Sequence, residues 1–84
     1  MKTIQELGAA VAARRQALGL KQHSVAHQAG VTPESLSRFE RGRTAEFGSR
    51  KLLAVLAVLH IELQFIEIGR SGSLDELRSE RAKS

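Results

Sequence analysis

Several features are missing from this sequence, and each absence narrows what the chain can be. No cysteine is present, so neither a disulfide framework nor a thiolate metal site can form. Residues 1–7 are mixed polar and lack the apolar core of a signal peptide. The longest apolar run, 52–59, is far shorter than the roughly 20 residues that cross a bilayer. We therefore expect a soluble, cytoplasmic protein with no membrane partner.

Patterns typical of catalysis and of cofactor binding are also missing. The sequence has no glycine-rich phosphate loop, no paired carboxylate motif and no convincing set of nucleophile, base and orienting residue. His23 and His27 have the four-residue spacing that can hold a metal on a helix, but no cysteine or acidic third ligand lies nearby. We expect no enzyme, no metal site and no cofactor.

The chain is short, and its positive charge is concentrated in one region. Eighty-four residues form one small domain, whose core is marginal alone and gains from oligomerisation. The net charge is +4, and the stretch from Arg14 to Lys51 holds eight basic and only three acidic residues. A localised basic face is typical of phosphate binding, although a solvated charged surface is the ordinary alternative.

The centre of the sequence, residues 20–43, predicts two short helices joined by a tight turn. Gln22 to Ala29 has helical apolar spacing, and Gly30 and Val31 make the turn. Thr32 is a preferred N-cap, and proline is favoured at the first helical position. We expect the second helix from Pro33 to Arg41. Such a pair can place its second helix in a DNA major groove.

This stretch, L-x-Q-x-x-V-A-x-x-A-G-V-T-x-x-x-L-S-R-F-E-R-G-R, resembles the helix-turn-helix of the phage Cro and repressor family, also called the XRE type. The matching positions follow the family's spacing without a gap: Gln22, Ala26, Gly30, Val31, Leu36, Ser37, Glu40 and Gly42. Lys21 departs from the usual Ser or Thr cap. Pro33 stands where many relatives carry a base-reading side chain, so any readout must come from its neighbours.

The resemblance implies that Gln22 points its amide at a phosphate, as a helix N-terminus also would. It further implies that Arg15 pairs with Glu40, a structural role for both. Side chains able to reach base edges are those of Glu34, Ser35, Ser37 and Arg38. Arg38 is the first choice for specificity, since arginine can bind guanine bidentately, with a phosphate clamp as the alternative. Candidates for contact with the DNA backbone are Lys21, His23, Thr32, Arg41, Arg43 and Arg50.

Helices are also expected on both sides of the motif. Thr3 and Glu6 form a capping box that opens a helix to Leu18, and Gly19 stops it. After a loop at 43–48 that tucks Phe47 beneath it, Ser49 can cap a further helix that ends at His60. That helix is apolar nearly all round, so it should be buried on more than one side, partly by a partner subunit.

Residues 61–68 alternate between apolar and polar side chains as a strand does, up to a slip in phase at Ile66. No other segment has this pattern, so pairing with the same strand of a second subunit across a two-fold axis is the economical solution. A disordered or packed extended tail is the alternative. The expected dimerisation residues are Ile61, Leu63, Phe65, Ile66 and Ile68.

A helix-turn-helix followed directly by L-x-I-E-L-x-F-x-x-I, residues 59–68, resembles the HipB-type antitoxins. The resemblance implies a transcriptional repressor of its own operon that binds pseudo-palindromic operator DNA and a HipA-like kinase toxin. A stand-alone regulator of phage, restriction-modification or chromosomal genes remains open, as does a protein-binding adaptor without a DNA role. In the cell, a DNA-bound protein of this kind would be associated with the nucleoid.

The predicted fold is therefore mainly α. It is a four- to five-helix, lambda-repressor-like helix-turn-helix domain whose C-terminal strand pairs across a homodimer. Residues 1–68 form the DNA-binding and dimerisation domain, and 69–84 form a flexible polar tail. Residues 73–77 in that tail could add one or two helical turns, and ordering of the tail on a toxin or other partner is the alternative to disorder.

Overall fold

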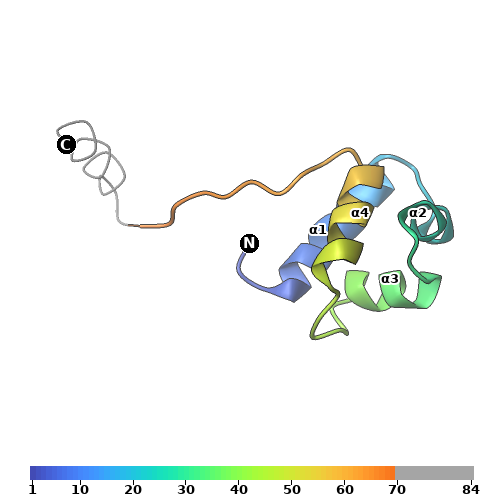
Figure 1. The fold of residues 1–84 in the computed structure, drawn as a ribbon, viewed down its shortest axis with the longest axis horizontal. Coiled ribbons are helices and arrows are strands. Elements are labelled where there is room, and N and C mark those ends of the chain that lie inside the picture. The colour runs from blue at the N-terminus through green and yellow to red at the C-terminus, as the bar shows by residue number, and fades with distance from the viewer. Residues whose placement is uncertain (70–84) are drawn as a thin grey trace.

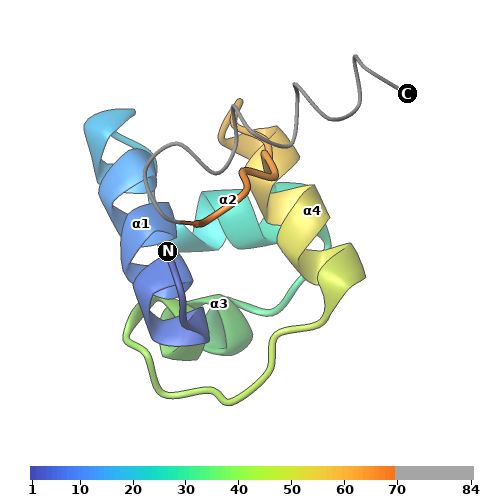
Figure 2. The same ribbon diagram turned by 90° about the vertical axis from the view of Figure 1, so that its left-hand side faces the viewer.

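Four helices make up the body of the protein in a computed structural model that describes residues 1–69 (Figure 1). They are α1 (Ile4–Ala17), α2 (Gln22–Ala29), α3 (Pro33–Glu40) and α4 (Ser49–Val58). α3 packs against α1 and α2, and α2 packs against α4. Figures 1 and 2 show α3 lying across one end of α1. The mainly α prediction is confirmed, while the tail at 70–84 and the fifth helix at 73–77 lie outside the described residues.

The core is built from the inward faces of all four helices. Its fully buried larger side chains are Val11, Val25, Leu36, Phe39, Val55 and Leu59. The ring of Phe47 stacks on that of Phe39, with centroids 4.2 Å apart and planes 8° apart, so the loop between α3 and α4 is anchored to the core. Phe47 is thus buried, as predicted.

All four helices end in the same hydrogen-bond pattern. After α1, the Leu20 N–H donates to the Arg15 carbonyl and the Gly19 N–H to the Gln16 carbonyl, which is the Schellman motif. Its central residue must adopt a left-handed conformation. Glycine supplies it at the first three helix ends, at positions 19, 30 and 42. At the end of α4 His60 takes this place with φ 57°.

The left-handed conformation of His60 gives a stability prediction. A residue with a Cβ has a steric cost in this conformation that glycine avoids. We therefore expect the free energy of unfolding of His60→Gly to be about 1 kcal/mol higher than that of His60→Ala. The alanine variant is the matched control, because it removes the imidazole and keeps the strain. Urea unfolding followed by circular dichroism measures the difference. Equal midpoints for the two variants would contradict the prediction.

One local prediction is wrong, and a second needs a partner chain to be tested. Ser49 is the first residue of α4 and not its cap; Gly48 holds the cap position, with φ 87° and no side-chain hydrogen bond. Residues 61–68 form no strand in this single chain, and their pairing with a second subunit stays a prediction. They leave the end of α4 as an irregular segment that runs away from the helices (Figure 1). A strand needs the backbone groups of a neighbour, and residues 1–60 are helices, turns and loops. We call residues 61–69 the C-terminal arm.

Candidate nucleic-acid interface

The α2–turn–α3 unit is fixed by local contacts. Gly30 takes φ 73° and allows the Val31 N–H to reach the Ala26 carbonyl at 2.9 Å, which buries Val31 between the helices. The Thr32 hydroxyl accepts from the Ser35 N–H at 3.1 Å and so caps α3. Pro33 is the first helical residue, as expected. The two helices are therefore held rigidly at a sharp angle.

α3 has a buried side and an outward side. Leu36, Phe39 and Glu40 are buried, and they fasten the helix to the core. Glu34, Arg38 and Arg41 are exposed, and Ser35 and Ser37 are half-buried. The polar groups that the sequence assigned to base reading thus lie on the helix away from its packed side, on a rigid support.

A buried carboxylate joins α3 to the rest of the domain. Glu40 accepts from Arg15 through two hydrogen bonds of 2.9 Å, from Nε to Oε2 and from Nη2 to Oε1. The Gln22 amide donates to the same Oε1 at 2.9 Å, and Arg15 Nη1 donates to the Leu20 carbonyl at 2.8 Å. The side chains of Arg15 and Glu40 are only 12% and 3% exposed. The ion pair that the resemblance implies is therefore present.

The basic residues separate into two groups. Arg14 Nε donates to the Leu59 carbonyl at 3.0 Å and so caps the end of α4, while Arg15 holds Glu40. The other six basic residues between positions 14 and 51 are all exposed; they are Lys21, Arg38, Arg41, Arg43, Arg50 and Lys51. Between positions 14 and 51, the accessible positive charge therefore lies on the helix-turn-helix and the start of α4, where phosphates would be bound.

Residues 11–66 match the helix-turn-helix family. The chain belongs to that family. A search among individually characterised proteins gives no match. The helix-turn-helix family of this XRE type is a family of DNA-binding transcription regulators, which are typically non-enzymatic. The chain is accordingly a DNA-binding transcription regulator, and α3 is the helix that the family's architecture offers to the major groove.

In the free helix-turn-helix, Gln22 makes a contact that the sequence did not predict, and its contact with a phosphate stays a prediction. Its amide was expected to face a phosphate, but its Nε2 donates to Glu40. A hydrogen bond to a buried carboxylate is charge-assisted and stronger than one to water, so the amide turns inward in the free protein. The backbone N–H groups at the start of α2 remain without a side-chain cap, because Lys21 supplies none.

The expected phosphate contacts lie around this start of α2 and the ends of α3. Lys21, His23, Thr32, Arg41 and Arg43 are all exposed. Arg41 Nε also reaches back to the Ser37 carbonyl at 3.4 Å. Their role in DNA binding stays a prediction.

Two residues that position the helix-turn-helix escaped the sequence interpretation. Arg14 was counted with the basic surface, and nothing in the sequence marks its bond to Leu59, 45 residues away. Gly8 is buried in α1, and a Cβ there would overlap the Phe39 carbonyl oxygen. A glycine inside a helical pattern signals such a close approach, so the signal for Gly8 was available.

No other type of site is found among the described residues. Within 1–69, no group of three or more His, Cys, Asp or Glu side chains is placed to hold a metal ion. Over the same range, no helix has the length and apolar content to cross a membrane.

Proposed function

We propose that this protein is a homodimeric, sequence-specific repressor that places two α3 helices in successive major grooves of a pseudo-palindromic operator. The observation that carries the proposal is the two-sided character of α3, whose buried side fixes it while Glu34 and Arg38 stand exposed. In a two-fold dimer the reading helices lie about 34 Å apart, one turn of DNA.

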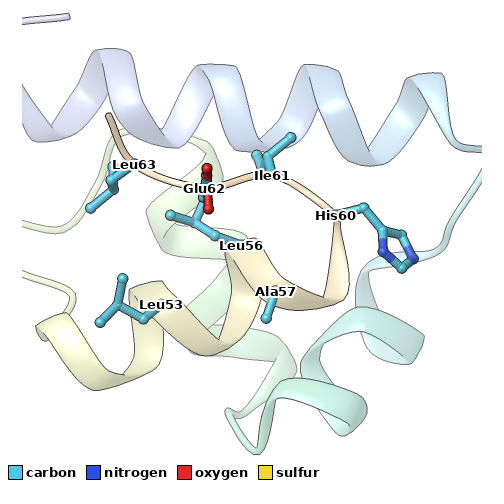
Figure 3. A pocket seen from close by; sticks show the side chains of 7 residues that line it. All are labelled: Leu53, Leu56, Ala57, His60, Ile61, Glu62 and Leu63. Atoms are coloured by element: carbon cyan, nitrogen blue, oxygen red, sulfur yellow. The ribbon is translucent and has the colours of Figure 1, made fainter. Parts of the chain in front are cut away.

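The C-terminal arm supports the dimer. Phe65 is 97% exposed, and Ile66 and Ile68 are also largely exposed, although such apolar side chains gain free energy when they are buried. At the root of the arm, Leu53 and Ala57 on α4 and Leu63 of the arm are among the residues that line a shallow groove of about 540 Å³ (Figure 3). A second copy would cover this surface and supply the missing backbone partners of a two-stranded ribbon formed by Ile61, Leu63, Phe65, Ile66 and Ile68.

Within this proposal, the HipB-like antitoxin is the finer assignment. It rests on the sequence pattern of residues 59–68, with alternating apolar residues after the last helix. A HipA-like kinase encoded beside this gene, and copurifying with the protein, would favour the antitoxin over a stand-alone regulator. Either regulator would act in the cytoplasm at the nucleoid.

A substitution in the arm tests the dimer and its consequence for DNA binding. We expect Phe65→Glu to sediment as a monomer and to bind operator DNA about a hundredfold more weakly, because two linked half-site contacts gain at least that factor over one. The helical content should stay unchanged, since Phe65 is 97% exposed and packs against no helix of the described residues 1–69.

Gln64→Glu is the matched control for this experiment. It introduces the same charge one residue away, at a polar position of the alternating pattern, and should leave both mass and affinity close to those of the parent. If Phe65→Glu remained a dimer of unchanged affinity in sedimentation and gel-shift measurements, the arm would not be the dimerisation element.

A further inference from the structure

Few functional groups remain free on the outward side of α3. The Thr32 hydroxyl accepts the Ser35 N–H, and Arg41 reaches back to the Ser37 carbonyl. Ser35 and Ser37 are half-buried. The only ion pair within residues 1–69 is that of Arg15 with Glu40. Glu34 and Arg38 are therefore two exposed charged groups that form no ion pair with any of the residues that the structure describes.

Glu34 carries a negative charge on a surface that must approach negatively charged phosphates. The exposed charged residues around it on the helix-turn-helix are basic, namely Lys21, Arg38, Arg41 and Arg43. A carboxylate near DNA is repelled by the backbone unless it meets a hydrogen-bond donor. The first turn of a helix does favour an acidic residue through the helix dipole, and this is the structural alternative that an experiment must exclude.

The DNA major groove offers such donors only on base edges. Cytosine presents its N4 amino group, whereas adenine presents its N6 amino group beside the N7 acceptor. A carboxylate can accept a hydrogen bond from the N4 amino group of cytosine, whereas the N7 lone pair of adenine repels it. Arg38 has the complementary preference, because its guanidinium can donate two hydrogen bonds to O6 and N7 of guanine.

We propose that Glu34 and Arg38 together read G·C base pairs in each operator half-site, Glu34 accepting from a cytosine and Arg38 donating to a guanine. Four residues span about 6 Å along a helix, so the two contacts would fall on base pairs one or two steps apart. This inference rests on the proposed function, because it requires α3 to lie in the major groove.

Selection from a library of random DNA duplexes with the full-length protein tests the first part. We expect enriched sites to carry a cytosine and a guanine one or two steps apart in each half-site. Gel shifts then compare each variant on the selected site and on a site in which the cytosine is replaced. The readout is the ratio of the two affinities, since removing a negative charge raises binding to every DNA.

For Glu34→Gln we expect the discrimination ratio to fall by roughly tenfold or more. Glu46→Gln is the matched control, because Glu46 is an exposed glutamate in the loop before α4; it changes the same charge and should leave the ratio intact. Arg38→Lys keeps the positive charge and loses the bidentate geometry, so it should lower discrimination at the guanine by a similar factor.

The outcomes separate the inference from the proposed function. No enriched sequence with the parent protein would overturn both. An enriched operator on which Glu34→Gln and Glu46→Gln behave alike would overturn the inference alone and leave Glu34 as a helix-dipole residue. Enrichment of adenine at the position that Glu34 controls, or full discrimination by Arg38→Lys, would also overturn it.

Discussion

Replacing Arg15 by alanine is expected to lower the free energy of unfolding by about 3–5 kcal/mol. The substitution leaves the Glu40 carboxylate, whose side chain is only 3% exposed, with the Gln22 amide as its one remaining side-chain partner. A charge buried without its counter-ion costs far more than the net worth of the pair. Urea denaturation followed by circular dichroism measures the loss.

The effect should be large relative to the stability of the whole domain. The free energy of unfolding of proteins is roughly 0.05–0.15 kcal/mol per residue, so that of a chain of 84 residues is small. We therefore expect Arg15→Ala to be largely unfolded at 37 °C. Because Arg15 also holds the Leu20 carbonyl, the turn before α2 should loosen along with α3.

Two further variants show whether the cause is the unpaired charge. Arg38→Ala removes an exposed arginine from the same domain and should change stability by less than about 0.5 kcal/mol. Adding Glu40→Leu to Arg15→Ala removes the buried charge and should recover much of the loss. An Arg15→Ala variant that melts like the parent would show that the pair contributes nothing to stability.

In the helix-turn-helix, contacts between residues close in the sequence could be predicted, and contacts between distant residues could not be predicted from spacing. Some features depend only on residues close in the sequence, so residue type alone predicts them. These are the N-cap at Thr32, the proline in the first turn at Pro33 and the left-handed turn at Gly30. The Arg15–Glu40 pair spans 25 residues. Here only the family resemblance supplied the partner, because spacing on a chain does not say which distant groups meet.

Three features needed the three-dimensional structure. The inward turn of Gln22 depends on Glu40 being buried beside it, which its position at a helix start does not reveal. Arg14 is diverted from the surface by a carbonyl 45 residues away. The alternation of residues 61–68 indicates a strand, yet strand formation depends on a neighbouring chain, so the pattern predicts a surface to be covered and not the state of a single chain.

Gly8 gives the other large expected effect. At an ordinary helical position, replacing glycine by alanine stabilises a protein by about 0.5–1 kcal/mol. At Gly8 the added Cβ would overlap the carbonyl oxygen of Phe39, in the backbone of α3. A backbone atom cannot rotate away as a side chain can, so α1 and α3 must move apart. We expect Gly8→Ala to lose about 3 kcal/mol in urea unfolding, the upper part of the range for overpacked cores.

The neighbouring position supplies the control for Gly8→Ala. Ala9 is exposed on the same helix, and Ala9→Gly should cost about 1 kcal/mol through helix propensity alone. One substitution replaces glycine by alanine and the other replaces alanine by glycine, so helix propensity alone predicts changes of opposite sign in the free energy of unfolding. A close contact between α1 and α3 predicts instead that both substitutions destabilise the protein. A Gly8→Ala variant that unfolds at or above the parent's urea midpoint would show that the helices are not in backbone contact. Because α3 carries Glu34 and Arg38, the same displacement should weaken operator binding even at temperatures where the variant remains folded.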